Sequence, residues 1–328
     1  MPSYDGIMKR KYYEGTSQII NLSSEIGKLL GIIDANYLRK PKASLRKTNK
    51  IKSIQSSLWI EGNTLSEKQV SDIIENRRVS GPAKDIVEVK NAIAVYNNIL
   101  KFKYNNLKSY LSAHKLLMKG LMQDAGKFRT QGVGVFKGEK VAHVAPPAWN
   151  VKNLMTESFY YLSKSEDNLI IKSCVFHYEM EFIHPFMDGN GRMGRLWQTV
   201  ILIQENPVFE FLPIEHEIKA EQLKYYEALS RSDKEGVCTV FVEYMLTMIK
   251  QSLEKLINGQ RVKLSDNERP RYFKENYKVI EFARKDYLEM FKDISTATAT
   301  RDLKKGIDEN LWEKYGDNRT TIYKMKTQ

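Results

Sequence analysis

Residues 184–195 read HPFMDGNGRMGR and concentrate side chains of complementary chemistry within twelve positions. A histidine can accept a proton near neutral pH, a carboxylate can hold Mg²⁺, and two arginines one helical turn apart present guanidinium forks. Two glycines let successive backbone N–H groups turn inward and form an anion-binding nest before a helix. In chain order these residues are His184, Asp188, Gly189, Gly191, Arg192 and Arg195. Together they predict a site for polyphosphate chemistry.

The segments on both sides of this stretch have helical periodicity. Residues 169–182 and 192–203 carry apolar side chains at spacings of three and four, and Pro185 ends the first helix at or before His184. From Gly189 onward the stretch also matches the dinucleotide fingerprint G-x-G-x-x-G. That fingerprint requires a preceding β-strand and an acidic residue about 20 positions later. Because the preceding segment is helical, we set the dinucleotide interpretation aside.

With every fixed position filled, HPFMDGNGRMGR resembles the signature of the Fic family, H-P-F-x-D/E-G-N-G-R-x-x-R. Residues 128–130 (Phe-Arg-Thr), a glycine-rich segment at 131–144 and the two prolines at 146–147 resemble the family's flap and the segment after it. Small and β-branched residues alternating around Lys137-Gly138-Glu139 independently predict a β-hairpin there. The resemblance spans roughly residues 40–255.

The resemblance implies transfer of AMP from ATP to a hydroxyl group of a target protein, with Mg²⁺ as the cofactor. His184 would deprotonate a Ser, Thr or Tyr of the target, and Asp188 would hold Mg²⁺ between the α- and β-phosphates. The remaining motif residues would bind phosphates: Gly189, Asn190 and Gly191 the α- and β-phosphates, Arg192 the β-phosphate and Arg195 the γ-phosphate. Phe186 would be a core anchor. The flap would hold the target segment by strand addition, through Phe136, Lys137, Gly138 and Val144.

A second motif lies upstream, where residues 57–63 read SLWIEGN. It resembles the inhibitory helix motif of the same family, S/T-x-x-x-E-G/N, with Ser57 and Glu61 at its fixed positions. In the family this glutamate pairs with the second arginine of the signature, which corresponds here to Glu61 with Arg195. A carboxylate on that guanidinium would occupy the place of the γ-phosphate and leave ATP in a non-productive pose. The resemblance therefore implies a self-inhibited enzyme.

Helical periodicity dominates the rest of the chain, so we predict a mainly α fold. It would comprise a Fic-type helical bundle with a β-hairpin flap, plus a C-terminal winged helix-turn-helix. We divide the chain into an N-terminal helical region with the inhibitory motif (1–105), a catalytic core with its following helices (106–257), a polar linker (258–271) and the winged helix-turn-helix (272–328). Within the last part we expect a helix over residues 272–291, a recognition helix over 298–306 and a small hairpin near Arg319.

Composition narrows the class of protein. Hydrophobic residues make up 42% of the 328 positions, which excludes a disordered chain. The two cysteines, Cys174 and Cys238, lie too far apart in the sequence to suggest a disulfide framework. No apolar run approaches the ~18 residues of a membrane span, so we expect a cytoplasmic protein without a membrane partner. The sequence does not decide whether the protein forms a homodimer.

The net charge of +12 leaves nucleic acid as an alternative partner. Residues 39–52 carry seven basic residues and no acid, which we interpret as a solvated helix face. The tail from residue 259 has sixteen basic and twelve acidic residues, and its expected recognition helix carries Arg301, Lys304 and Lys305 but also Asp302. The alternative function is a DNA-binding regulator that uses residues 272–328, with the Fic core as a sensor.

Within the enzyme class, relatives of the family transfer UMP, phosphocholine or phosphate, or remove AMP. The complete set of Asp188, Arg192 and Arg195 favours a conventional nucleoside triphosphate over these alternatives. His177, seven residues before His184, is more typical of a structural histidine than of a metal ligand. The tryptophans are expected in the core, namely Trp59, Trp149 and Trp197.

Overall fold

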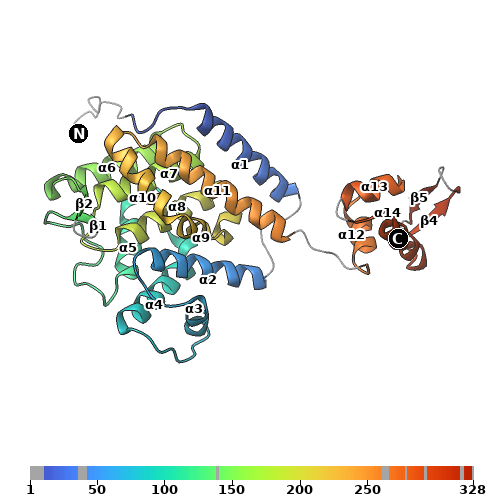
Figure 1. The fold of residues 1–328 in the computed structure, drawn as a ribbon, viewed down its shortest axis with the longest axis horizontal. Helices are drawn as coiled ribbons and strands as arrows, with labels where there is room; N and C mark the ends of the chain where they lie inside the picture. The colour runs from blue at the N-terminus through green and yellow to red at the C-terminus, as the bar shows by residue number, and fades with distance from the viewer. Residues whose placement is uncertain are drawn as a thin grey trace. The chain divides into compact units, whose positions relative to one another are not determined.

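The computed structural model describes residues 11–35, 43–137, 140–260, 266–277, 279–291, 294–317 and 321–326. The chain divides into two compact units, Met1–Gln260 and Arg261–Gln328, each with its own apolar core (Figure 1). Both units are mainly helical, as the sequence periodicity predicts. The predicted N-terminal region and the predicted catalytic core belong to the same unit. Within the described ranges, no helix combines the length and the apolar character that a membrane crossing requires.

The first unit is a bundle of helices with one β-hairpin. Its α-helices are α1 (Ser17–Ala35), α2 (Ala43–Ile60), α3 (Glu67–Ile74), α4 (Ala83–Asn97), α5 (Leu107–Leu117), α6 (Val151–Lys164), α7 (Leu169–Ile183), α8 (Asn190–Glu205), α9 (Ile214–Ala220), α10 (Gln222–Glu235) and α11 (Thr239–Gln260). Short 3-10 helices lie between them: η1 (Ile99–Lys101), η2 (Ala148–Asn150) and η3 (Pro207–Phe211). The hairpin strands are β1 (Gly134–Lys137) and β2 (Lys140–Val144).

Helices α7 and α8 form the centre of this unit. Nearly all of α7 is buried, and so is every residue of α8 from Asn190 to Leu202. The two helices contribute to both apolar clusters of the unit, one shared with α1, α10 and α11 and the other with α2 to α6. A helix enclosed on all sides carries apolar residues around its whole circumference. The loop that joins α7 to α8 is therefore anchored in the core at both ends.

Helix α2 brings polar side chains into the interior of the bundle beside α8. The buried polar residues on this helix are Asn49, Ser53, Gln55, Ser56 and Ser57. The helix ends at Ile60, and Gly62 takes a left-handed backbone conformation (φ 92°) that favours glycine. The chain then enters α3 through a capping box formed by Ser66 and Gln69.

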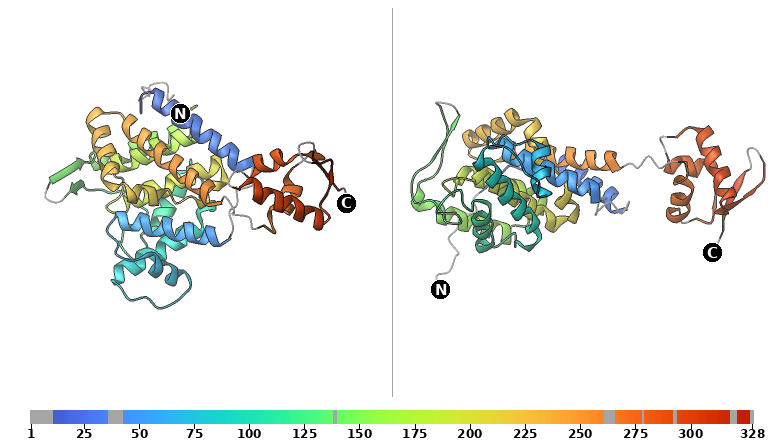
Figure 2. Two further views of the ribbon diagram at one scale, coloured as in Figure 1. Left: turned by 45° about the vertical axis from the view of Figure 1, so that its right-hand side comes forward. Right: turned by 90° about the horizontal axis from the view of Figure 1, so that it is seen from below.

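Strands β1 and β2 pair antiparallel and confirm the predicted hairpin. Figure 2 shows the two strands projecting from the helices of the first unit. Phe136 and Lys137 lie in β1, while Val144 ends β2 and is 75% exposed. Gly138 lies outside the described residues. The end of strand β2 is therefore accessible to solvent.

The second unit is small and combines helices with a sheet. In chain order it consists of α12 (Arg269–Asn276), β3 (Glu281–Phe282), α13 (Arg284–Met290), α14 (Thr296–Asp308), β4 (Trp312–Tyr315) and β5 (Ile322–Met325). The sheet is antiparallel with the strand order β3-β5-β4. Helices followed by the β4–β5 pair are the order that the predicted winged helix-turn-helix requires. Arg319, expected in the hairpin, lies outside the described residues.

The predicted single helix over residues 272–291 is wrong. The chain forms α12 and α13 with strand β3 between them. Phe282 of β3 is buried, and its ring packs against those of Phe273 and Trp312. The apolar residues of this segment therefore belong to one strand and two short helices. Periodicity alone misses this arrangement, because pairing with β5 and packing on Trp312 override local preference.

Gly306 of α14 lies against Trp312, and a Cβ at this position would overlap the indole ring. We expect Gly306→Ala to lower the unfolding free energy of the second unit by about 1–3 kcal/mol, since overpacking strains a core. Differential scanning calorimetry of the whole chain measures the effect. Gly27→Ala is the control, because described neighbours leave open space there, and we expect it to stabilise α1 by about 0.5–1 kcal/mol. An unchanged or raised stability of Gly306→Ala would contradict the packing.

Candidate active site

The motif loop, residues 184–189, is held by backbone geometry and by one side chain. Helix α7 ends at Ile183, and His184 caps it in a left-handed conformation (φ 50°), with its N–H bonded back into the helix at 3.1 Å. The Asn190 Oδ1 accepts from the Phe186 N–H at 2.8 Å, and its Nδ2 donates to the Phe186 carbonyl at 2.9 Å. Both polar atoms of the Asn190 side chain therefore bond the backbone of the loop. Only the backbone N–H of Asn190 can bond an anion.

Phe186 is fully buried and anchors the loop to α5. Its ring stacks on the imidazole of His114, with 3.5 Å between the ring centroids. The Gly126 N–H donates to His114 Nδ1 at 2.8 Å, so Nδ1 carries no proton and Nε2–H donates to the Asp188 carbonyl at 3.0 Å. Burial lowers the pKa of His114 to about 4. His114 thus positions the loop as a neutral ring.

Arg129 ties the end of α7 to the base of the hairpin. This buried side chain donates from Nε to the His184 carbonyl at 2.7 Å and from Nη1 to the Gln131 carbonyl at 2.9 Å. Its Nη2 donates to the carbonyls of Pro146 and Ile183. The Arg129 guanidinium therefore links the backbone of His184 to the segments that flank the β1–β2 hairpin.

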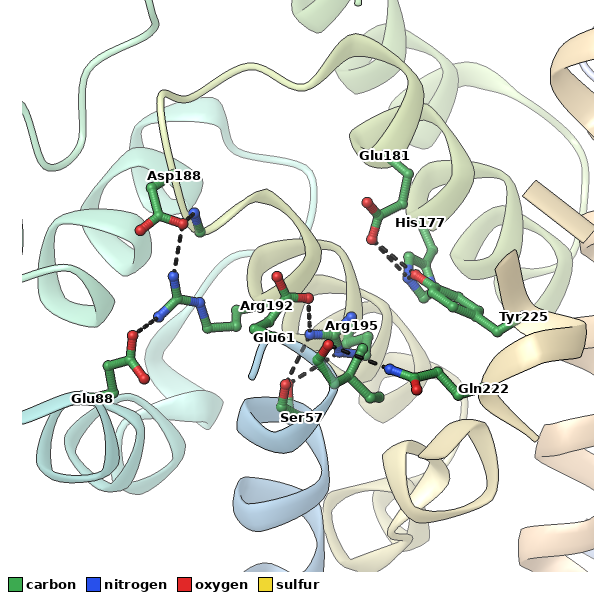
Figure 3. A network of polar contacts seen from close by, with 12 residues as sticks. Ser57, Glu61, Glu88, His177, Glu181, Asp188, Arg192, Arg195, Gln222 and Tyr225 are labelled. Carbon is green, nitrogen blue, oxygen red and sulfur yellow. Dashed lines mark hydrogen bonds and ion pairs between the residues drawn. The ribbon is translucent and has the colours of Figure 1, made fainter. Parts of the chain in front are cut away.

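Helix α2 places Glu61 on Arg195 (Figure 3). Glu61 Oε1 lies 2.7 Å from Arg195 Nη2. Ser57 accepts two further bonds from the same guanidinium, at its carbonyl (2.9 Å) and at Oγ (3.2 Å). The Arg195 side chain is 1% exposed and that of Glu61 is 31% exposed. The structure thus brings together the two fixed residues of the upstream motif and the last arginine of HPFMDGNGRMGR.

The Glu61 carboxylate also lies over the first turn of α8. A Cβ on Gly191 would collide with Glu61 Oε1 and would approach Arg195 Nη1 to 3.1 Å. The N–H groups in the first turn of a helix lack intrahelical acceptors and attract anions. The space above Gly191 is therefore an anion site that a carboxylate of the chain itself fills.

Arg192 contacts two carboxylates from different elements. Its Nη1 lies 3.0 Å from Oε1 of Glu88, a buried residue of α4, and its Nη2 lies 2.9 Å from Asp188 Oδ1. Asp188 also accepts from the Gly189 N–H at 2.6 Å, and its side chain is 52% exposed. Asp188 can therefore turn an oxygen toward a ligand, whereas Glu88 is enclosed.

Two buried guanidinium donors of the motif have no hydrogen-bond partner among the described residues, namely Nε of Arg192 and Nη1 of Arg195; Nε of Arg46, outside the motif, is a third such donor. Leaving a buried donor unbonded costs about 1–3 kcal/mol, and more when the group is charged. Phosphate and carboxylate oxygens are the acceptors that satisfy such a fork best. The two orphaned donors thus indicate a ligand with several anionic oxygens.

The fit of Mg²⁺ can be judged from the carboxylates. Within the described ranges, no group of three or more His, Cys, Asp or Glu side chains gathers to hold a metal ion. Mg²⁺ usually keeps several waters and binds through one or two carboxylates together with substrate phosphates. Asp188, half-exposed beside the anion site, fits that kind of coordination, with a phosphate and water supplying the other ligands.

His184 is half-buried at the end of α7. Its Nδ1 lies 3.4 Å from the Glu181 carbonyl, which favours the proton on Nδ1 and leaves Nε2 as the basic nitrogen. Burial raises the pKa of the Glu181 carboxyl, but hydrogen bonding to His177 and the charges of His177, Arg195 and His184 outweigh it. The pKa falls to about 2, so Glu181 is a fixed negative charge near the motif.

His177 has the structural role that the sequence predicts. Its Nδ1 lies 2.9 Å from Gln198 Oε1, and its Nε2 lies 3.1 Å from the Tyr225 hydroxyl. The same hydroxyl donates to Glu181 Oε1 at 2.9 Å. Figure 3 shows His177, Glu181 and Tyr225 as one group beside the paired arginines. The group joins α7, α8 and α10 behind the site.

Sequence reasoning missed Glu88 and His114 altogether and gave Arg129 no role. No local pattern distinguishes Glu88 and His114 from ordinary surface or core residues. Arg129 lies in the stretch 128–130 that resembles the family, but the sequence does not show which carbonyls it bonds. The expectation for tryptophan was wrong twice, because Trp59 is 40% exposed and Trp149 79% exposed, and it is confirmed for Trp197, which is buried. The ring of Trp59 instead packs under the Lys219 ammonium, 4.8 Å from the ring centroid.

Comparison with known proteins agrees with this geometry. The model of the Fic/DOC family matches residues 104–202. A Fic family protein from Desulfovibrio desulfuricans G20 is 34% identical, with 97% of this chain and 99% of that chain aligned and a TM-score of 0.73. The chain therefore belongs to the Fic/DOC family. The helical bundle of Fic-1 from C. elegans also matches, at 20% identity and a TM-score of 0.59 over 74% of this chain and 72% of that chain, which shows the shared fold.

Relatives with a named activity are more distant. The "Protein adenylyltransferase Fic" of Drosophila grimshawi is 27% identical over 250 residues, which cover 72% of this chain and 48% of that protein. The protein of the same name in Aedes aegypti is 29% identical over 215 residues, covering 62% of this chain and 41% of that protein. The chain spans about half the length of the curated relatives that it matches.

The pKa of His114 provides a test of the loop geometry. We expect its imidazole NMR signals to titrate near pH 4, because the unprotonated Nδ1 accepts the Gly126 N–H and burial disfavours the charged ring. The unfolded chain takes up this proton near pH 6.5. Stability therefore falls as the pH drops from about 6.5 to 4. Titration of His114 near 6.5 in the folded protein would contradict the assignment.

Proposed function

We propose that the chain is a self-inhibited protein adenylyltransferase that transfers AMP from ATP to a hydroxyl side chain of a target protein. The observation that carries the proposal is the Glu61 carboxylate, which lies on Arg195 and above Gly191. It stands in for the anion that a helix N-terminus and a buried guanidinium attract together. Membership of the Fic/DOC family and the names of the relatives support the choice of reaction.

The nucleotide would be bound by charge and by backbone dipoles. The first-turn N–H groups of α8, at Asn190 and Gly191, would bond the α- and β-phosphates. The unpartnered donors Arg192 Nε and Arg195 Nη1 would bond the β- and γ-phosphates. Bound through Asp188 and the phosphates, Mg²⁺ would neutralise the charge that builds up on the leaving diphosphate. Such positioning and charge neutralisation supply most of the catalysis in phosphoryl-type transfer.

The base would be His184. Its Nε2 would take the proton from the target's Ser, Thr or Tyr hydroxyl while the hydroxyl oxygen forms a bond to the α-phosphorus. The bond from that phosphorus to the diphosphate breaks, and the diphosphate leaves. Arg129 supports this step by holding the His184 carbonyl, and the Glu181 carbonyl orients the ring.

The target would be held by the hairpin. The β1–β2 pair would offer a backbone edge for strand addition along Phe136, Lys137 and Val144, and along Gly138, which lies outside the described residues. Arg129 bonds the backbone at both ends of this hairpin and the backbone of His184. A target segment paired with the hairpin edge would therefore be held at a fixed position relative to His184, the proposed general base. Asp188 and both arginines favour a nucleoside triphosphate over the other groups that the family transfers.

In this proposal Glu61 limits the rate of AMP transfer. We expect Glu61→Gly to raise AMP incorporation into protein by about 10- to 1,000-fold, because a partly buried ion pair is worth a few kcal/mol and each 1.36 kcal/mol is a factor of ten. His184→Ala in the Glu61→Gly background should abolish incorporation. The measurement is labelling of lysate proteins from radioactive ATP, followed by mass spectrometry of the added group.

The control is Glu25→Gly, which removes a carboxylate that pairs with Lys250 on the surface. We expect it to label like the unmodified chain. Equal labelling in Glu61→Gly and Glu25→Gly would contradict self-inhibition by Glu61. Labelling that survives His184→Ala would contradict the assignment of the base.

A second candidate function belongs to the second unit, and one observation favours it. Asp302, which weakened the DNA interpretation of the sequence, is 1% exposed and bonds Arg269 through both oxygens. It is therefore absent from the surface of α14. The exposed residues from the start of that helix to Lys304 are neutral or basic, namely Thr296, Ala297, Thr300, Arg301 and Lys304. A small-residue, basic face on the second helix of a helix-turn-helix suits the major groove of DNA.

We expect a random-sequence DNA duplex to bind the full chain in a gel-shift titration at low salt. Arg301→Ala with Lys304→Ala should reduce the slope of log affinity against log salt by about one to two, since each lost phosphate contact removes about one unit. Lys234→Ala, in the first unit, and His184→Ala should leave binding unchanged. Absence of a shift at low salt, or equal loss in Lys234→Ala, would exclude DNA as the partner of this face.

A further inference from the structure

Glu88 bonds two partners from different elements, and the ammonium of the exposed Lys84 lies 3.9 Å from its Oε1. Its Oε1 lies 3.0 Å from Arg192 Nη1, and its Oε2 accepts from Asn63 Nδ2 at 2.8 Å. Glu88 is 7% exposed and Asn63 5% exposed, so both contacts are shielded from water. Charged hydrogen bonds are strongest in such surroundings, and their geometry is the most restrained.

The contact with Glu88 uses one side of the Arg192 fork only. The guanidinium presents Nε–H and one Nη2–H along a common edge, while Nη1 projects beyond the other end. Glu88 takes Nη1, and Nε is buried without a partner in the described part of the chain. Nη2 contacts Asp188, whose half-exposed carboxylate can move. Glu88 thus holds the guanidinium so that its Nε–Nη2 edge remains for a ligand.

Asn63 in turn is fixed in the turn between α2 and α3. Its Oδ1 accepts from the Leu65 N–H at 3.1 Å, and its Nδ2 also donates to the Asp85 carbonyl of α4 at 3.2 Å. Thr64 reinforces this docking, because its N–H and its hydroxyl both donate to Asp85 Oδ2, at 2.8 and 2.7 Å. The turn that begins with Glu61 is therefore bonded to α4 at several points.

One turn consequently serves both arginines. Glu61 restrains Arg195, and Asn63, two residues later, holds Glu88 against Arg192. If α2 and its turn left the bundle to release Arg195, Arg192 would lose its orientation at the same moment. Ile54 and Leu58, buried at 0% and 2% exposure, would be exposed as well.

We propose that Glu88 is a positioning residue for Arg192, kept in place by Asn63, and that inhibition is relieved by a swing of the Glu61 side chain while the turn stays docked on α4. The proposal rests on the proposed function, because it takes Arg192 as the ligand of the β-phosphate. Glu61 is 31% exposed at its side chain, so it can swing out without unpacking the helix.

The test of Glu88 compares ADP with AMP by isothermal titration calorimetry in the Glu61→Gly background. Glu88→Gln should weaken ADP binding by about tenfold or more, because the charged hydrogen bond that orients Arg192 is lost, and should leave AMP binding within about twofold. Asn63→Ala should show the same selectivity, and it keeps Glu88 if Glu88→Gln fails to fold. Glu25→Gln is the matched carboxylate control and should change neither affinity.

An equal loss of ADP and AMP affinity would mean that Glu88 stabilises the fold and does not position Arg192. Unchanged ADP affinity would mean that Glu88 has no effect on the orientation of Arg192. Either result overturns the proposal and leaves the proposed function intact. If Glu61→Gly itself binds no ADP and labels no protein, the proposed function fails instead. The two failures are therefore distinguishable.

Hydrogen exchange tests the swing. The amides of Thr64 and Leu65 are bonded to Asp85 and Asn63, and we expect their protection in the unmodified chain to be unchanged by saturating ATP and Mg²⁺. The same should hold in Glu61→Gly. A drop in protection of these amides on nucleotide binding would show that the turn departs, and would overturn the proposed mode of release.

Discussion

The contact of Glu61 with Arg195 above the first turn of α8 is the interaction on which the functional interpretation depends. A helix N-terminus and a buried guanidinium both attract an anion, and the chain supplies one from its own α2. The carboxylate lies where Gly191 leaves room for an oxygen. Any nucleotide that places a phosphate on Arg195 has to compete with it. The same ion pair therefore stabilises the ligand-free site and, in the function that we propose, restrains the reaction.

In the rest of the site, the residues that hold the motif loop differ from the residues that could bind a charged ligand. Contacts that involve no carboxylate hold the motif loop: the Phe186 ring stacks on an uncharged His114, and the Arg129 guanidinium donates to backbone carbonyls. The groups with spare hydrogen-bonding capacity are Arg192, Arg195 and the half-exposed Asp188. Because α7 and α8 are buried along their whole facing lengths, these groups rest on the most rigid part of the bundle.

The sequence predicted what is local and missed what depends on tertiary contact. Residues 184–195 form one loop and one helical turn, so their order already determines their proximity, and the helical class and the hairpin follow from periodicity. Glu61 was paired with its arginine through family resemblance, since nothing local links segments so far apart. The contacts of Glu88 and Arg129 could not be predicted, because α4 and the loop between α5 and β1 bring them to the motif from distant segments. Asp302 reads as a surface acid until packing buries it, and β5 likewise breaks the helix expected in the tail.

The most direct test of the central contact is the binding of ATP and of ADP, each with Mg²⁺, to the unmodified chain and to Glu61→Gly by isothermal titration calorimetry. Only ATP carries the γ-phosphate with which Glu61 competes for Arg195. We expect the substitution to raise ATP affinity by about tenfold or more and ADP affinity by less than about threefold, in line with the worth of a partly buried charged pair. Equal gains for both nucleotides, or no gain for ATP, would contradict competition between Glu61 and the γ-phosphate.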